Sequence, residues 1–343
     1  MRQTLRLCLA ATGIFGWAAT ASAQQVITFA SFGGAYQAAQ RKALLDPIQQ
    51  KLNIVIKEDT LTGLADVRAQ VRANAVKWDV ADLGGASCAR GTVEGLFEPL
   101  DYGVIKTDGI NPKMVNKDWI GVIYYSTVIA WNTEKFGENG PQTWADVWDV
   151  KKFPGTRSFS RGASETMEIA LMADGVAPDK LYPLDVDRAM KSLAKIKPNV
   201  VAWWASGAQS AQLLKDGEAD IVAIWNGRAG AAIKDGAKAA TTYNQGILNA
   251  DCLVIPKGAK NAELAQKVIA LMVSPELQAD IPKYINYGPI NEKAFATGKI
   301  SPEEAARINS SPANTARQTV ISFDYWTDNL AKLTEKMDAF LQQ

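Results

Sequence analysis

The chain has 343 residues, a length that indicates two domains. Hydrophobic residues make up 47% of it and charged residues 21%, a globular balance that argues against a largely disordered chain. The 37 Lys and Arg residues nearly cancel the 36 Asp and Glu residues, and no basic run stands out, so nucleic acid is not a predicted partner. The sequence has no histidine and three cysteines, which excludes Ser/His/Asp and Cys/His catalytic systems, His-ligated metals and four-Cys metal sites. No cofactor and no metal are implied.

The first 23 residues have the pattern of a secretory signal peptide. Arg2 and Arg6 precede an apolar run over 7–19, and small residues then supply an A-x-A cleavage site that ends at Ala23. No later stretch reaches the roughly 18 apolar residues that a membrane span needs. The mature chain is therefore expected to be exported and not anchored.

Cys88 and Cys252 remain after removal of the signal peptide. An oxidising compartment permits a disulfide between them, but their spacing alone does not place the two thiols together. The favoured interpretation is two buried, apolar thiols.

The first part of the mature chain alternates apolar strands with helical segments. This alternation predicts an α/β fold with a mainly parallel sheet, in which ligands bind at the carboxyl ends of strands. Two of the predicted strands end in glycine-containing turns, at 31–36 and 82–85. The predicted strands are 26–30, 53–57 and 78–83, and the predicted helices are a segment that ends before Pro47 and the segment 66–75.

A long β-branched and aromatic segment over 120–132 separates this part from a second α/β series. Thr143 and Asp146 have the spacing of a helix cap at the start of a helix over 143–148. The arrangement fits two lobes joined by a hinge. Further predicted strands are 220–225 and 252–255, and further predicted helices are 165–174, 187–196, 210–215, 262–274 and 328–341.

Aromatic and acidic side chains stand where several predicted strands meet turns. Aromatic rings offer their negative faces to a cation, and carboxylates balance its charge in a cleft. This combination favours a site for an ammonium group, although a pair of carboxylates is also typical of glycosidases. The aromatic residues are Phe32, Tyr36, Tyr124 and Trp225, and the acids are Asp82, Glu165 and Asp251.

Several short motifs together resemble the periplasmic spermidine/putrescine-binding proteins of ABC transporters. The resemblance covers nearly the whole mature chain. It implies a two-lobe periplasmic-binding-protein fold of type II-like architecture, with a mainly parallel sheet flanked by helices in each lobe and a ligand cleft between the lobes. The motifs are Trp-Asp-Val at 78–80, Glu-Gly-Leu-Phe-Glu-Pro-Leu-Asp at 94–101, Ile-Ala-Trp-Asn at 129–132, Thr-Trp-Ala-Asp-Val-Trp at 143–148, and the segments 218–227 and 252–261.

The resemblance also implies domain limits and partners. Lobe 1 would comprise 24–130 and 252–343, with C-terminal helices packing across both lobes, and lobe 2 would comprise 131–251. The protein would act in the periplasm as a monomer without catalytic activity. It would pass a small cationic or zwitterionic solute to an ABC transporter permease in the inner membrane.

The family's binding residues are carried over one position at a time. Glu165 and Asp251 match its two amine-pairing carboxylates, and Trp225 matches an aromatic of its binding box. Two positions depart from the polyamine binders, because Asn249 replaces a Trp and Gly162 replaces an acid. The first loop and the hinge strand contribute the remaining expected ligand-binding positions, which are Phe32, Gly33, Gly34, Tyr36, Asp82 and Tyr124.

Arg228 leaves the identity of the ligand open, because a guanidinium grips a carboxylate bidentately. The first hypothesis is a polyamine such as putrescine or spermidine. The second is a zwitterion such as 4-aminobutyrate, held by Arg228 and Asp251, and Arg161 is a further candidate for its carboxylate. An exported hydrolase that uses Glu165 and Asp251 is a remote alternative. Ferric ion is disfavoured, because the tyrosines at 124 and 125 alternate to opposite strand faces.

Overall fold

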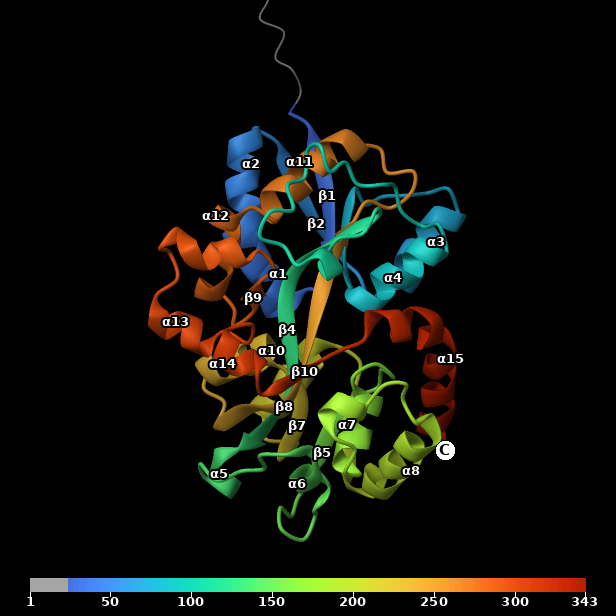
Figure 1. Ribbon diagram of the computed structural model, residues 1–343, viewed down its shortest axis with the longest axis vertical. Coiled ribbons are helices and arrows are strands. Elements are labelled where there is room, and N and C mark those ends of the chain that lie inside the picture. The colour runs from blue at the N-terminus through green and yellow to red at the C-terminus, as the bar shows by residue number, and fades with distance from the viewer. Residues whose placement is uncertain (1–23) are drawn as a thin grey trace, which may run out of the picture.

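Two long antiparallel strands, β4 (Trp119–Asn132) and β8 (Ala239–Val254), lie side by side along the length of the molecule (Figure 1). The structure is a computed structural model that describes residues 24–343, so the predicted signal peptide lies outside the described residues. Both strands belong to one mixed sheet in the order β2-β1-β3-β8-β4-β7-β5-β6, with β9 and β10 paired off this path. The β-branched and aromatic residues of β4 are buried along almost its whole length, as expected for a central strand.

The upper half in Figure 1 is built on three parallel strands. Apolar side chains alternate along them, so that one face packs on α1, α2 and α11 and the other on α3 and α4. The strands are β1 (Val26–Ser31), β2 (Val55–Thr60) and β3 (Val80–Gly84), and the helices are α1 (Gly34–Gln40), α2 (Asp46–Leu52), α3 (Leu64–Arg72), α4 (Gly85–Val93) and α11 (Ala262–Met272).

The lower half repeats this arrangement with three further parallel strands. Thr143 and Asp146 form the predicted capping box at the start of α6. The strands are β5 (Arg157–Ser160), β6 (Val200–Trp204) and β7 (Ile221–Trp225), and the helices are α5 (Thr133–Phe136), α6 (Trp144–Trp148), α7 (Thr166–Ala173), α8 (Val186–Ile196), α9 (Gly207–Lys215) and α10 (Asn226–Lys234).

The C-terminal segment connects the two halves. Helix α15 (Phe323–Leu341) packs on α4 of the upper half and buries Trp326, Leu333 and Met337 in the core of the lower half (Figure 1). The other elements of this segment are α12 (Pro275–Gln278), β9 (Gly288–Pro289), α13 (Pro302–Arg307), α14 (Pro312–Thr315) and β10 (Gln318–Val320). Short 3-10 turns occur at Pro112–Met114, Pro178–Lys180, Lys197–Asn199, Ile281–Lys283 and Glu292–Thr297.

The prediction that the first helix ends before Pro47 was wrong. The chain continues from α1 through a π-helical turn at Arg41–Leu45 into α2, which ends at Leu52. Pro47 is tolerated because it lies in the first turn of α2, where a proline's fixed φ suits a helix.

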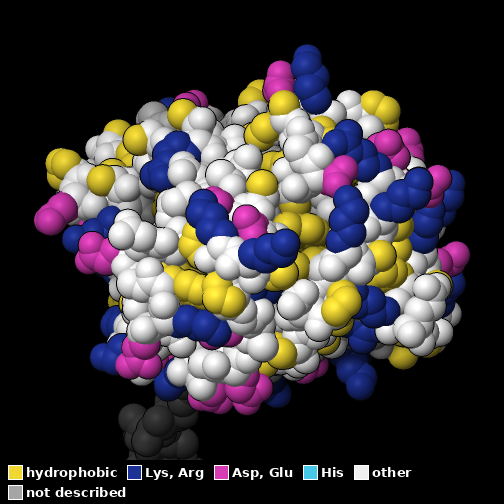
Figure 2. Space-filling model, turned by 90° about the horizontal axis from the view of Figure 1, so that it is seen from below, with side chains coloured by type: hydrophobic (Ala, Val, Ile, Leu, Met, Phe, Trp, Pro, Cys, Tyr) yellow, Lys and Arg dark blue, Asp and Glu magenta, His cyan; other side chains and the backbone are white. Residues whose placement is uncertain are grey.

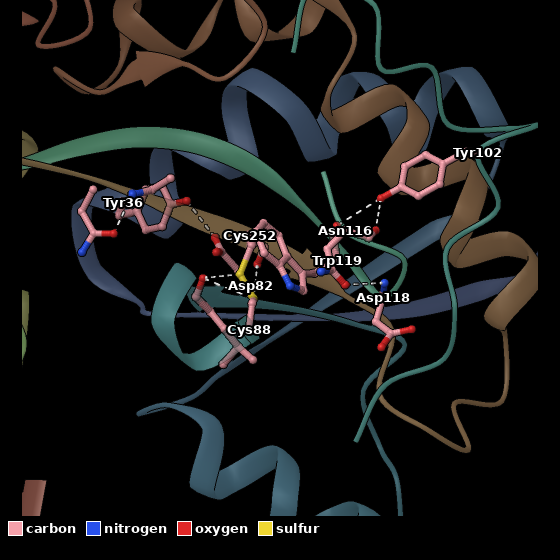
Figure 3. The surroundings of a disulfide bond; sticks show 11 residues. Tyr36, Asp82, Cys88, Tyr102, Asn116, Asp118, Trp119 and Cys252 are labelled. Carbon is pink, nitrogen blue, oxygen red and sulfur yellow. Dashed lines mark hydrogen bonds between the residues drawn. A yellow bond between two sulfur atoms is a disulfide. The ribbon is translucent and has the colours of Figure 1, made fainter. Parts of the chain in front are cut away.

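The preference for free thiols was also wrong, because Cys88 and Cys252 form a disulfide with a Cα–Cα distance of 6.6 Å (Figure 3). The sheet register brings the two together. Leu83 of β3 pairs with Cys252 of β8, and the helix that carries Cys88 begins directly after β3. The bond therefore ties the start of α4 to the central strand β8.

Replacing both cysteines by serine is expected to lower the free energy of unfolding by about 2–5 kcal/mol, because the disulfide restricts the unfolded chain over a long loop. Urea unfolding of residues 24–343 with and without reductant measures this effect. Reductant should destabilise the wild-type protein and leave the Cys88→Ser/Cys252→Ser variant unchanged. Equal stability of the two proteins without reductant would contradict the disulfide.

Figure 2 shows the face seen from below Figure 1, where basic and acidic side chains are interspersed and hydrophobic side chains occur in small groups. Such scattered apolar exposure is normal for a globular protein surface. Within residues 24–343, no helix is both long enough and apolar enough to cross a membrane.

Candidate functional site

A cavity of about 260 Å3 opens between the two halves. Its walls include Phe32 and Gly84, which follow or end strands of the upper half, and Ser160 and Trp225, which end strands of the lower half. In both halves the cavity therefore lies at the carboxyl ends of parallel strands, where a ligand site is expected. Seven of the predicted ligand-binding residues line it: Phe32, Tyr36, Glu165, Trp225, Arg228, Asn249 and Asp251.

Aromatic rings in edge-to-face and tilted contacts form much of the cavity wall. Tyr36 contacts Tyr287 with ring centroids 5.2 Å apart, and Tyr125 contacts Trp225 at 5.8 Å. Tyr125 also lies 6.2 Å from Tyr287, so the rings form a continuous group. Such a wall presents ring faces and edges that suit a cation and an aliphatic chain.

Tyr124 does not line the cavity, and its neighbour Tyr125 takes the predicted place. Successive side chains of a strand point to opposite faces, so only one of the two tyrosines faces the site. Tyr124 pairs with Ala250 and Gly288 and packs partly buried against the core of the upper half. Tyr287 was missed because it follows a short turn far along the chain and carries no strand signal.

Glu165 is fully engaged by hydrogen bonds from the protein. Its carboxylate accepts from the Tyr125 hydroxyl at 3.0 Å, the Trp225 indole at 3.2 Å and the Asn249 amide at 2.6 Å, and also from the Thr127 hydroxyl. Burial raises its pKa, and these donors act in the opposite direction. Four donors leave Glu165 little capacity to accept further hydrogen bonds from a ligand.

Asp251 presents a different environment. It lies on β8 opposite Gly84 and is 6% exposed. Burial, with the nearby carboxylates of Asp82 and Glu165, raises its pKa well above the usual range. Among residues 24–343, Arg228 is the cation that favours its ionised form. A bound ammonium group would neutralise this carboxylate.

Arg228 extends from α10 into the space between the halves and is 2% exposed. Its Nη2 donates to the carbonyl oxygens of Gly33 at 3.0 Å and Phe32 at 3.5 Å. Its Nε has no acceptor among residues 24–343. The guanidinium is thus held by neutral carbonyls and lacks a directly bonded carboxylate, a costly state for a buried charge.

Gly33 and Gly34 do not line the cavity, and both contact Arg228 instead. A Cβ on Gly34 would lie 2.6 Å from Arg228 Nη1, and the φ of +59° at Gly34 also favours glycine. Gly207 of α9 makes a similar close approach, where a Cβ would lie 2.7 Å from Nε. Two glycines, one from each half, therefore leave room for the guanidinium.

Asp82 lies outside the cavity, behind Tyr36, and is completely buried. Arg161, the other candidate for a carboxylate, points outward and pairs with Asp338 at 3.1 Å. The start of α4, from Gly84 to Ser87, lines the cavity and was not predicted as binding, although the glycine turn at 82–85 marked the place. Within residues 24–343, no cluster of His, Cys, Asp and Glu side chains fits a metal ion.

Residues 43–313 match the model of the bacterial extracellular solute-binding protein family. The chain is 34% identical to a gamma-aminobutyric acid-binding protein of Pseudomonas aeruginosa over 95% of both chains. It is 28% identical to the spermidine/putrescine-binding periplasmic protein of Escherichia coli over 62% of both. It is 46% identical to an ABC transporter substrate-binding protein from Bradyrhizobium japonicum, with a TM-score of 0.88 and coverage of 92% of this chain and 99% of the other.

Proposed function

We propose that this chain, which belongs to the bacterial extracellular solute-binding protein family, binds a small zwitterionic amino acid of the 4-aminobutyrate class. The predicted family, the two-lobe fold and the role of substrate-binding protein of an ABC transporter are confirmed. The charges of the cavity favour one class of solute.

One observation carries the proposal: the cavity holds a buried guanidinium, Arg228, and a buried carboxylate, Asp251, neither of which forms a salt bridge with a side chain of residues 24–343. An ω-amino acid would neutralise both, with its carboxylate on Arg228 and its ammonium on Asp251. The aromatic wall would cover the chain between the two ends. The P. aeruginosa relative, named for gamma-aminobutyric acid, supports this assignment.

Thermal unfolding of residues 24–343 tests the proposal. Binding to the native state stabilises a protein by about 2.7 kcal/mol at a hundredfold excess of ligand over Kd, so 4-aminobutyrate should raise the midpoint by several degrees. Butyrate and butylamine each lack one of the two charges and serve as matched controls, which should give much smaller shifts. A shift with putrescine but none with 4-aminobutyrate would contradict the proposal.

A polyamine is the second candidate, as the E. coli relative suggests. The four-ring wall and the two carboxylates Glu165 and Asp251 favour a cation. Arg228 opposes it, because a second ammonium group would meet a buried guanidinium without a carboxylate partner. Putrescine and spermidine therefore belong in the same thermal series.

Closure of the two lobes around the solute is part of the proposal. We place lobe 1 at 24–130 and 252–343 and lobe 2 at 131–251. A register shift between Thr127 and Ile129, where β4 leaves one stretch of β8 for another, supports a boundary near residue 130. Arg228 of lobe 2 already bonds to carbonyls of lobe 1 at residues 32 and 33, so the structure has the lobes in contact.

The remaining parts of the proposal concern the setting in which the protein acts. We infer that the mature chain is released in the periplasm after cleavage at Ala23 and delivers its solute to an inner-membrane permease as a monomer. We also infer that this chain does not catalyse a reaction, which the similarity to solute-binding proteins supports.

A further inference from the structure

Asp82 is a buried carboxyl group that does not line the ligand cavity, so ligand contact does not explain why a carboxyl group is buried there. It is 0% exposed and lies behind Tyr36, outside the cavity. Its Oδ2 accepts from the Tyr36 hydroxyl at 2.7 Å and the Gln40 amide at 2.6 Å, and from the Ser31 hydroxyl at 3.4 Å. Its Oδ1 has no hydrogen-bond partner among residues 24–343. Figure 3 shows Tyr36 directed at Asp82 beside the disulfide.

Tyr36 connects this buried group to the cavity. Its ring lines the cavity, and its hydroxyl lies close enough to Asp251 to favour the ionised form of that carboxylate as well. Asp82 and Asp251 are also neighbours in the sheet, because Leu83 and Gly84 of β3 pair with Cys252 and Asp251 of β8. One hydroxyl proton thus serves two buried carboxyl groups, and it cannot satisfy both when both are ionised.

The surrounding charges make double ionisation costly in the empty site. Asp251 on β8 and Glu165 at the start of α7 are the other buried carboxyl groups of the cluster, and Arg228 on α10 is its cation. Three tyrosines face the same space, Tyr36 from α1, Tyr125 from β4 and Tyr287 before β9, and Cys88 of α4 is held in the disulfide. Three buried carboxyl groups therefore share one guanidinium.

We propose that the coupled pair Asp82 and Asp251 holds one proton while the site is empty and releases it to solvent when the ammonium group of a ligand binds at Asp251. The added positive charge allows both carboxyl groups to be ionised at once, so ligand affinity increases as the pH rises. Asp82 acts through Tyr36 and Asp251 and is a positioning residue, since it does not touch the ligand. Burial raises the pKa of Asp82 to about 7, within the range where this exchange is measurable.

This inference rests on the proposed function, because it requires a ligand with an ammonium group. Isothermal titration calorimetry of residues 24–343 with 4-aminobutyrate tests it, in buffers of different ionisation enthalpy at pH about 6 and about 8. At the lower pH the heat should depend on the buffer and report release of a proton. The Kd should fall with rising pH, by up to about tenfold per pH unit for one proton, and become constant above the titration of Asp82.

Asp82→Asn removes one of the two coupled carboxyl groups and should make both the heat and the Kd much less dependent on buffer and pH. Glu168→Gln is the matched control, because Glu168 is another buried carboxyl group with a pKa raised to about 7 by burial, bonded to Tyr182 and Trp326 away from the cavity. This control should release as many protons as the wild-type protein. Undiminished proton release by Asp82→Asn would overturn the proposal.

If Asp82→Asn does not fold, infrared difference spectroscopy of the wild-type protein provides an alternative test. The carbonyl band of a protonated carboxyl group should disappear when 4-aminobutyrate binds at pH about 6. Binding without loss of this band and without proton release would overturn the inference alone. Absence of binding to both 4-aminobutyrate and putrescine would overturn the proposed function and this inference with it.

Discussion

Replacing Asp251 by alanine is expected to weaken the binding of 4-aminobutyrate more than a hundredfold. The substitution leaves the ligand's ammonium group buried without a counter-charge, a loss of about 3–5 kcal/mol when one partner of a buried pair is removed. Glu165 does not compensate, because its oxygens already accept four hydrogen bonds. Isothermal titration calorimetry measures the change in Kd.

The same substitution should stabilise the empty protein at neutral pH. Burial and the neighbouring carboxylates raise the folded-state pKa of Asp251, so its contribution to stability is full below the unfolded-state pKa and is lost as the pH rises toward the folded-state pKa. Removing the group removes that loss. Asp187→Ala, at an exposed position on α8 where the carboxylate pairs with Lys336, is the matched control and should leave the Kd unchanged without stabilising the empty protein. Binding by Asp251→Ala within a few-fold of the wild-type protein would contradict the site.

Replacing Arg228 by methionine is expected to reverse the preference between the two ligand classes. The affinity for 4-aminobutyrate should fall about a hundredfold or more, because the ligand carboxylate loses its charged partner. The affinity for putrescine should stay unchanged or increase, because the repulsion of its second ammonium group is gone. Competition binding with both ligands on one protein sample measures the ratio of the two affinities.

The ratio is the informative quantity, because Arg228 also bonds to the carbonyls of Phe32 and Gly33 across the lobes. Loss of those bonds affects both ligands alike and cancels in the ratio. Arg161→Met is the matched control, since Arg161 is exposed and pairs with Asp338 outside the cavity, and it should leave the ratio unchanged. An equal loss for both ligands in Arg228→Met would show that Arg228 acts only as an interlobe contact.

Local patterns predicted much of the fold because their physical causes are local. The β-branched run at 120–132 became β4, and the cap at Thr143 opened α6 as expected. Pro47 misled the prediction, since proline ends a helix in its interior but is accepted in a first turn. Helices α4 and α10 begin with glycine-containing segments and have weak sequence signals, so they were missed.

Site residues next to predicted strands could be identified from the sequence. Contacts between segments that are distant in the sequence were harder to predict. Trp225 could be placed from the end of its strand. Asp251 was placed from the start of the strand predicted at 252–255, but it lies within β8, which begins at Ala239. The choice between Tyr124 and Tyr125 depends on which strand face meets the other half. The pairing of the two cysteines depends on the β3–β8 register, which no spacing reveals. Whether Arg228 or Arg161 faced the cavity was a question of packing between lobes.

The position of β8 between β3 and β4 has a consequence for the order of folding. Strands β1 to β3 are made first, but the upper half gains its central strand only after residue 254 has been synthesised, and its core further requires α11. Strands β5 to β7 and their helices follow one another directly in the chain. The core of the lower half in turn includes residues of α15, the last helix of the chain. We therefore expect neither half to complete its core until the C-terminal segment has been made. A chain whose folding is delayed in this way can still pass through a narrow pore.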